Sequence, residues 1–444
     1  MYCLCVPLCT LCVSLCNKEF IKYMKIIKLV LICILCIYKT VAQDTIRLTI
    51  EQAEKQFVTK NLLLLAERNN IAVADAAIVQ AKLLNNPTIS VGDMNFWSPK
   101  AAENLEIDRA AFADKIAYSV ELEQMIRTAG KRRKLIDLEK VSKDIAIQEF
   151  EAFLLALRTE LRTGLFETVY LQSYTDVLKK QVSVISDLVE VYKRQSANGN
   201  IAKSELIRLQ SSMIELETEA NEILTELNKQ YKELKILLNI SPETKVTIEP
   251  PTVLTKHPDD ISPAELWEMA KTSHPDYILS DLNVEYGEKN IALEKSQRVP
   301  DLGVRFNYDR YGGVWKDFVG VGVSFDIPVF NRNQGNVKIA QFKREQAAYE
   351  AEYRKNRIQQ EIIERFTNYD RNYRFYKKHT DNDFTDDLDN MLDVYTRNLL
   401  NKNINMLEYV DFMNAYKTTK QALLIAKRNL DTSFAELQFS VGNF

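Results

Sequence analysis

The chain has 444 residues, which is enough for two or three ordinary domains. Its 58 basic and 61 acidic residues nearly cancel, so it lacks the polybasic composition typical of nucleic-acid-binding proteins. It has only three histidines, which disfavours a metal enzyme built on imidazole ligands.

The first predicted element is a secretory signal. After Met24, two lysines precede a short apolar stretch that ends in the small-residue cleavage pattern Thr40-Val41-Ala42. We therefore expect residues 1–42 to be an upstream segment plus a signal peptide that starts at Met24 and is cleaved after Ala42. All seven cysteines precede residue 37, without a following His or Cys at ligand spacing, so no metal site is predicted there. No lipobox precedes them, so the residues do not support a lipid anchor.

A pair of strands is predicted next, at about 88–96 and 115–125. In the second of these, apolar and small or charged residues alternate with the two-residue period of a strand. Asp93 interrupts the apolar row of the first. Each strand has the length of a tilted transmembrane strand, with one apolar and one polar or small face.

Two long helices are predicted after this hairpin, at about 130–195 and 201–239. No proline lies between Pro99 and Pro242, and proline is incompatible with a helix interior. Leucines recur there at three- and four-residue steps, which marks one helical face. The first helix would be about 100 Å long at ~1.5 Å per residue, which suggests a coiled-coil-like rod or a helical tube.

The same order of elements is predicted again in the second half of the chain. After a linker at 241–275, strands are expected at about 301–309 and 317–327. Helices are expected at about 334–398 and 404–440, because no proline follows Pro328.

These predicted elements form a tandem repeat. The residues that match at a separation of 203 are Tyr192 with Tyr395, Ile201 with Ile404, Glu205 with Glu408, and Leu234 with Leu437. Pro87 and Pro300, which open the two strand pairs, are 213 apart, and a longer tip of the first hairpin absorbs the difference. We assign residues 43–240 to the first repeat and 276–444 to the second, with tight turns at 198–200 and 401–403.

The strands suggest a shared barrel. Four strands cannot close a barrel alone, and open strand edges are not tolerated in lipid, so several protomers must contribute; three would supply twelve strands. Glu121, Arg305 and Asn307 are the candidate pore-facing residues. The candidate aromatic girdle near the strand ends comprises Trp97, Tyr311 and Trp315. The alternative is a soluble sheet with one wet face.

Three local motifs carry a resemblance to a known family. They are Asn85-Asn86-Pro87, Gly130-Lys131-Arg132-Arg133, and the run from Ile327 to Gly335. With the repeat plan, they resemble the TolC family of outer-membrane efflux factors over nearly all of the mature chain. They are closest to its heavy-metal and cation branch, the CzcC and CusC type.

The resemblance implies a mainly α protein with a transmembrane β-barrel portion. A homotrimer would form a 12-stranded barrel in the outer-membrane lipid, continuous with a long periplasmic α-helical barrel. The implied function is a passive efflux duct that works with a periplasmic adaptor (membrane fusion) protein and an inner-membrane pump of the RND type. The resemblance suggests metal cations or small toxic compounds as cargo, although secreted polypeptides also use ducts of this architecture.

The resemblance also implies a gate at the periplasmic mouth. The acidic residues that ring the closed aperture in the family fall on Glu408 and Asp411, whose first-half counterparts are Glu205 and Arg208. Three acidic side chains around a threefold axis would repel anions and attract cations. An Arg208–Asp411 pair between neighbouring helices is a second way to lock the mouth, and ordinary solvated positions are the alternative for both acids. Lys402 replaces the usual turn glycine, so that tip is expected to differ in construction.

A second class of function stays open on the sequence alone. It is a periplasmic coiled-coil scaffold or adaptor without a pore, whose strands form a soluble domain. Two equivalent halves, each joined to a hairpin with a lipid-compatible face, favour the duct. No nucleophile elbow, P-loop or HExxH motif is present, so neither an enzyme nor a cofactor is predicted.

Overall fold

The computed structural model describes residues 45–95, 117–251, 256–310, 315–380 and 384–442. The predicted leader at 1–42 lies outside these residues. The chain separates into two compact units, of which the smaller contains the chain up to Arg47 together with Ser241–Thr247. Strand β1 (Thr45–Leu48) pairs with β4 (Lys245–Ile248) in a two-stranded sheet.

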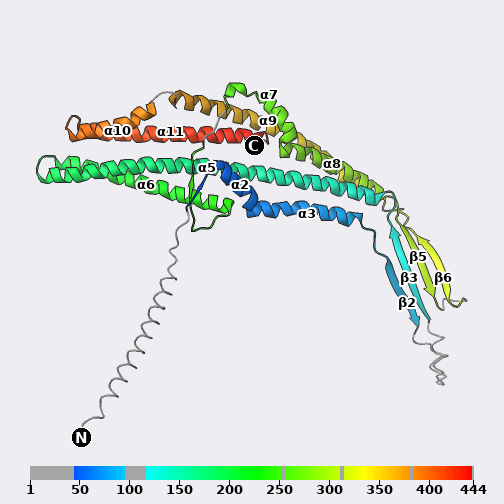
Figure 1. Cartoon of the computed structure of the whole chain (residues 1–444). Helices are drawn as coiled ribbons and strands as arrows, with labels where there is room; N and C mark the ends of the chain where they lie inside the picture. Colours follow the sequence, from blue (N-terminus) through cyan, green and yellow to red (C-terminus); the bar gives the residue numbers. More distant parts are fainter. Residues whose placement is uncertain (1–44, 96–116, 252–255, 311–314, 381–383, 443–444) are drawn as a thin grey trace, which may run out of the picture. The chain divides into compact units, whose positions relative to one another are not determined.

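The larger unit holds the long helices and a four-stranded sheet (Figure 1). Its first half contains α2 (Ile50–Lys60), α3 (Leu62–Lys82), β2 (Thr88–Asn95), β3 (Ala117–Ile126), α5 (Lys131–Ala197) and α6 (Lys203–Leu238). Its second half contains η1 (Pro258–Asp260), α7 (Pro263–Ser273), α8 (Pro275–Ser296), β5 (Leu302–Asp309), β6 (Phe318–Ser324), α9 (Gln334–Thr380), α10 (Phe384–Leu400) and α11 (Met406–Ser440).

The helices before the strands also repeat. Helix α7 begins and ends at the positions of α2 plus 213, and α8 begins at the first position of α3 plus 213. The segment 241–275, predicted as a linker, therefore contains α7, the counterpart of α2. After the strands the offset is 203, because α5 spans 131–197 and the pair α9 and α10 spans 334–400. One helix was predicted over 334–398; the structure has two, on either side of residues 381–383, which lie outside the described residues.

Residues in the left-handed backbone conformation lie next to helix ends in both halves, and they recur at the second offset of 203. Three pairs of them match, and their φ angles are given in parentheses: Gly130 (69°) with Asn333 (55°), Gly199 (76°) with Lys402 (59°), and Asn239 (50°) with Gly442 (76°). Such positions close helix ends because they turn the chain away from the helix axis. The repeat is therefore present in the backbone geometry as well as in the residues.

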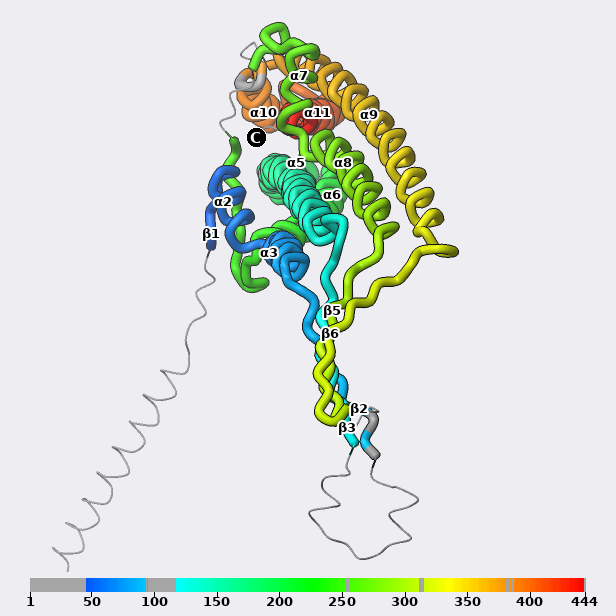
Figure 2. Tube along the Cα trace, turned by 90° about the vertical axis from the view of Figure 1, so that its right-hand side faces the viewer, coloured from blue at the N-terminus to red at the C-terminus, as the bar shows by residue number. Residues whose placement is uncertain are grey.

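The helices of the larger unit pack side by side. Near the strands the order of neighbours is α3, α5, α8 and α9, whereas towards the helix tips α6, α5 and α11 are neighbours. Figure 2 shows α5 and α6 lying together beside α8 and α9. None of the helices within the described residues combines the length and apolar character needed to cross a membrane.

The main hydrophobic core lies between the two helical hairpins near their tips. Tyr174, Leu178, Leu209 and Tyr409 are fully buried there. All buried residues of this core lie on helices, so neither face of the four-stranded sheet packs against it.

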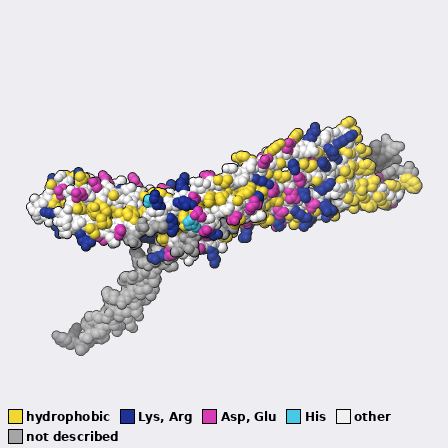
Figure 3. All heavy atoms as spheres, turned by 90° about the horizontal axis from the view of Figure 1, so that it is seen from above, with side chains coloured by type: hydrophobic (Ala, Val, Ile, Leu, Met, Phe, Trp, Pro, Cys, Tyr) yellow, Lys and Arg dark blue, Asp and Glu magenta, His cyan; other side chains and the backbone are white. Residues whose placement is uncertain are grey.

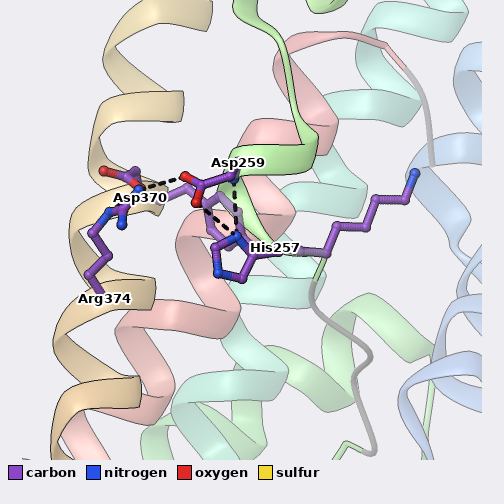
Figure 4. Close-up of polar contacts among 6 residues, drawn as sticks. His257, Asp259, Asp370 and Arg374 are labelled. Carbon is purple, nitrogen blue, oxygen red and sulfur yellow. Dashed lines mark hydrogen bonds and ion pairs between the residues drawn. The ribbon is translucent and has the colours of Figure 1, made fainter.

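A polar cluster fastens the segment around η1 to α9 (Figure 4). The Asp259 carboxylate accepts a hydrogen bond from Arg374 at 2.7 Å and lies 3.5 Å from Nδ1 of His257. Arg374 also donates to Asp370 at 2.7 Å, and the His257 ring packs edge-on against Tyr373. Both carboxylates raise the pKa of Arg374. The cluster serves to hold a connecting segment against a helix.

Candidate functional site

The four-stranded sheet has the order β2-β3-β5-β6, with every neighbouring pair antiparallel. In its register Glu121 lies opposite Asn307, and Glu123 lies opposite Arg305. These four side chains share one face because residues opposite each other in a sheet point the same way. The register thus brings together the three predicted pore-facing residues and adds Glu123.

The polar face is held by an ion-pair network. Arg305 lies 3.6 Å from Glu123 and 4.0 Å from Glu121, and Ser324 donates to Glu123 at 3.4 Å. Across the next strand pair, Gly320 lies opposite Asn307, and a Cβ at Gly320 would collide with the Asn307 carboxamide. Glycine there leaves room for the polar side chain of the neighbouring strand. The alternation of Glu121 and Glu123 in the sequence could have identified Glu123.

The opposite face of the sheet is apolar and exposed. Ile89, Leu122, Phe306 and Val321 form one row across the four strands. Ile89 is 67% exposed and Val321 is 70% exposed. Among the described residues β2 and β6 each pair on one side only, so the sheet has two open edges and an uncovered apolar face. Such a surface needs a partner or an apolar solvent.

The predicted aromatic girdle is described only in part. Trp315 is 73% exposed and lies just before β6. Trp97 and Tyr311 lie outside the described residues. Tyr118 and Tyr308 are cross-strand neighbours on the apolar face, with ring centroids 5.9 Å apart.

The two helix tips share one backbone design. At the first tip Asn198, Gly199 and Asn200 donate to the carbonyls of residues 194, 196 and 195. At the second tip Asn401, Lys402 and Asn403 donate to the carbonyls of residues 397, 399 and 398, which are the same positions plus 203. The expectation that Lys402 alters the construction of the second tip is therefore wrong, because Lys402 adopts the left-handed conformation itself.

The predicted gate residues all lie within the first three turns of α6 or α11. Glu408 forms a capping box with Asn405, accepting a hydrogen bond from its backbone N–H at 3.2 Å and donating its own N–H at 2.9 Å. Asp411, Glu205 and Arg208 are exposed. Within the single chain no ion pair joins Arg208 and Asp411, both of which are described.

A cavity of about 310 Å³ lies between the two tips. Tyr192, Ile201, Ile404 and Met406 contribute its apolar wall, and Glu205 contributes a carboxylate. The two hairpins are therefore not fully packed against each other at their ends.

Polar contacts join the two hairpins behind the tips. Lys417 on α11 donates to Glu219 on α6 at 2.7 Å, and Glu219 also accepts from Tyr174 on α5. Burial, and then the hydrogen bond to Glu219, raise the pKa of Tyr174. Arg428 on α11 pairs with Glu167 on α5 at 3.0 Å. The sequence did not identify these links, because they join positions on different helices, far apart in the chain, without a motif.

The histidines have local structural roles. Nδ1 of His257 accepts from the Asp259 N–H, and Nδ1 of His274 accepts from the Asp276 N–H. His379 packs against Phe375 with ring centroids 4.8 Å apart. Across the described ranges, no cluster of His, Cys, Asp and Glu side chains has the arrangement of a metal site.

Comparison with known proteins gives matches only at the level of structure. No protein-family model and no curated protein matches the sequence. The outer membrane channel CmeC of Campylobacter jejuni superposes with a TM-score of 0.72 at 13% identity, over 88% of this chain and 85% of that one. CusC, described in connection with transmembrane channel formation, gives 0.68 at 13% identity over 89% and 92%. The open state of the MtrE outer membrane channel of Neisseria gonorrhoeae gives 0.67 at 12% identity over 89% of each chain.

The chain therefore has the fold of these outer-membrane channels. The prediction of a mainly helical protein with a small sheet portion is confirmed. The resemblance to the TolC family is confirmed in its fold.

Proposed function

We propose that this chain is one protomer of a homotrimeric efflux duct in the outer membrane. The observation that carries the proposal is the sheet, which has an ion-paired polar face, an exposed apolar face and two open edges. A membrane-spanning sheet must satisfy its edges, and joining β6 of one copy to β2 of the next does so. Three copies supply twelve strands, four from each.

The long helices extend the duct into the periplasm. A helix of 67 residues, as α5 is, spans about 100 Å at ~1.5 Å per residue. The polar faces of the sheets would line the pore, and their apolar faces would contact outer-membrane lipid. The duct receives its cargo from a periplasmic adaptor and an RND-type inner-membrane pump. It conducts this cargo passively, without enzymatic activity or a cofactor. The local motifs favour metal cations or small toxic compounds as cargo.

The gate is proposed at the helix tips. Asp411 is the stronger candidate of the two acids, because the carboxylate of Glu408 is engaged in its own helix cap. Three copies of Asp411 near the axis would favour cations over anions. The Lys417–Glu219 contact restrains the hairpin of α10 and α11 against the hairpin of α5 and α6, so it opposes movement of the mouth.

Purification from an outer-membrane fraction tests the duct. We expect the protein to require detergent, to have the mass of a trimer by light scattering, and to show a hollow stalk by electron microscopy. A water-soluble monomer or dimer would instead indicate a periplasmic coiled-coil scaffold and would exclude the channel.

Conductance in planar bilayers tests the gate. We expect Asp411→Asn to raise the single-channel conductance and to reduce the preference for cations. Asp187→Asn, at an exposed position of α5 ten residues before the first tip, is the matched control and should behave as the wild type. Equal behaviour of the two variants would exclude Asp411 from the gate.

A further inference from the structure

Four segments of the chain meet where the helices give way to the strands. We call them the collar: residues 82–87, 124–134, 294–301 and 326–338. Hydrogen bonds join them, since Gln124 donates to the Asn85 carbonyl at 2.9 Å, and the Thr128 N–H donates to Asp301 at 2.9 Å. The Asn333 side chain donates to the Glu294 carbonyl at 2.9 Å. The collar is therefore one continuous part of the larger unit.

The collar is strongly basic although the whole chain is slightly acidic, with a formal net charge of −3. Its acidic residues are Glu294, Asp301 and Asp326. Its basic residues are Lys82, Arg127, Lys131, Arg132, Arg133, Lys134, Lys295, Arg298, Arg332 and Lys338. Basic residues in the collar thus outnumber acidic ones by more than three to one.

Most of these basic side chains form no ion pair within the described residues. Lys131 is buried and pairs with Asp301 at 2.8 Å. All four collar segments are described, and no other ion pair occurs in them. Further along the same helices, basic residues are paired, as in Arg344 with Glu288 and Lys355 with Asp281. Exposed lysines elsewhere, such as Lys179 and Lys193, also form no ion pair within the described residues, so what distinguishes the collar is its local excess of basic over acidic residues.

Helix stability does not explain this placement. Lys131, Arg132, Arg133 and Lys134 form the first turn of α5, and neither α5 nor α9 has an acidic residue in its first turn. Basic residues are unfavourable at that end of a helix, because the aligned peptide dipoles place positive charge there. An anionic surface outside the chain would offset this repulsion.

The collar borders the exposed apolar surface of the sheet. The connector from β6 to α9 continues that surface with exposed Phe325, Ile327, Val329 and Phe330, of which Phe330 is 93% exposed. Arg332 follows two residues later. In Figure 3 basic side chains gather next to the apolar end of the larger unit. A basic band beside apolar and aromatic side chains is the composition of a surface that binds at a membrane interface.

We propose that the collar binds the headgroups of anionic phospholipids in the leaflet nearer the helices. This inference rests on the proposed function, which places the apolar sheet face in lipid. Guanidinium and ammonium groups bind lipid phosphates, and Phe330 and Ile327 enter the boundary of the acyl chains. The collar thereby sets the depth of the duct in the membrane.

Lipid binding to the detergent-purified trimer tests the collar. Native mass spectrometry would count bound phosphatidylglycerol and, separately, phosphatidylcholine with the same acyl chains. We expect phosphatidylglycerol to bind about tenfold more tightly, and we expect this preference to weaken with salt. The quadruple variant Arg132→Gln, Arg133→Gln, Arg298→Gln, Lys338→Gln should lose the preference.

A matched control removes four exposed basic residues that lie away from the collar. It carries Lys179→Gln, Lys193→Gln, Lys203→Gln and Lys378→Gln, and it should retain the lipid preference. Equal binding of the two lipids, or an equal loss of the lipid preference in both quadruple variants, would contradict lipid binding by the collar. The conductance of the same preparations separates lipid binding by the collar from the duct function. A channel that conducts but shows no lipid preference contradicts lipid binding by the collar and leaves the duct function intact. Selective lipid binding that depends on the collar residues, in a protein that does not conduct, would contradict the duct and support the collar.

Discussion

The two halves of the chain use the same backbone turns with different side chains. At the tips the left-handed residue is Gly199 in the first half and Lys402 in the second. The following helix begins after Ala202, which makes no side-chain cap, in the first half and after Asn405, which makes a capping box, in the second. The second tip therefore combines a less favourable turn residue with a better helix cap.

The junctions between paired helices differ in a similar way. In the first half, Asn61 caps α3 and its amide donates to the Leu237 carbonyl at 2.8 Å. In the second half, His274 caps α8, while the neighbouring Ser273 hydroxyl donates to the Val441 carbonyl at 2.6 Å. In the first half one side chain both caps the helix and binds the neighbouring helix end, whereas in the second half two residues divide these two contacts. The comparison shows that backbone geometry is retained while the stabilising contacts move between residues.

The largest effect is expected where the second junction is tightest. Gly442 has φ 76°, and a Cβ there would lie 2.5 Å from the Ser273 carbonyl oxygen. We expect Gly442→Ala to lower the free energy of unfolding by about 3 kcal/mol, because backbone strain and a backbone collision add. Thermal or denaturant unfolding of the detergent-purified protein measures this.

Gly199→Ala is the matched control for this substitution. Gly199 has the same φ of 76°, but a Cβ there would have nothing within 4 Å. It should therefore show the strain alone, about 1 kcal/mol. Equal effects at the two glycines would mean that the C-terminal end of α11 is not held against the α7–α8 junction.

The sequence predicted the parts of the fold that depend on regular periodicity. The absence of proline across α5 and α6 and the alternation in β3 and β5 placed these elements within a few residues of their observed bounds. The helices before the strands, α2, α3, α7 and α8, were not predicted, although Asn61 and His274 precede α3 and α8 as caps. Their capping signals are local and weak, and α8 has no strong apolar face.

The candidate site was predictable on the sheet and less so at the tips. Alternation places Arg305 and Asn307 on one face of β5 and Glu121 on the polar face of β3. The register that aligns the apolar rows of the two strands then brings the polar faces together. The contacts behind the tips, such as Lys417 with Glu219, depend on how two hairpins pack, which no local pattern specifies. Sequence likewise could not show that Lys402 would adopt a left-handed conformation, because lysine rarely does so.

The helix caps at the two tips provide the next test. Asn405→Ala removes the side-chain acceptor of a capping box, so we expect a loss of about 1 kcal/mol of stability. Ala202→Asn should do the reverse at the first tip, because Glu205 stands at the position that completes a box there. We expect a gain of similar size, about 0.5–1 kcal/mol. If neither variant shifts the unfolding midpoint, the tips are frayed in solution.

The turn residues are expected to differ by a smaller amount. Lys402→Gly removes a left-handed lysine with φ 59°, so it should stabilise the protein by about 0.5–1 kcal/mol. Lys402→Ala removes the charge but keeps a Cβ in the same conformation, so it should not stabilise. A gain in both variants would instead assign the effect to the lysine charge. Differential scanning calorimetry at one pH distinguishes these results.

The smallest effect is expected at the junction histidine, and it depends on pH. Burial lowers the pKa of His274, and this outweighs the nearby carboxylates of Asp276 and Glu361, which raise it. The folded protein therefore binds this proton more weakly than the unfolded chain, whose histidine titrates near ~6.5. Stability should be fully present above about pH 7 and should fall as the pH drops below ~6.5 towards the lower folded-state pKa.

His274→Asn isolates this contribution, because Asn61 shows that asparagine can cap the equivalent helix in the first half. The unfolding midpoints of the variant and the wild type should differ by a constant amount above pH 7. Below that pH the wild type should lose stability faster, since only its unfolded state gains the extra proton there. Parallel curves between pH 5 and 8 would show that His274 stays accessible to protons in the folded protein. In that case the second junction would be looser than the first, and the two halves would differ in packing as well as in their caps.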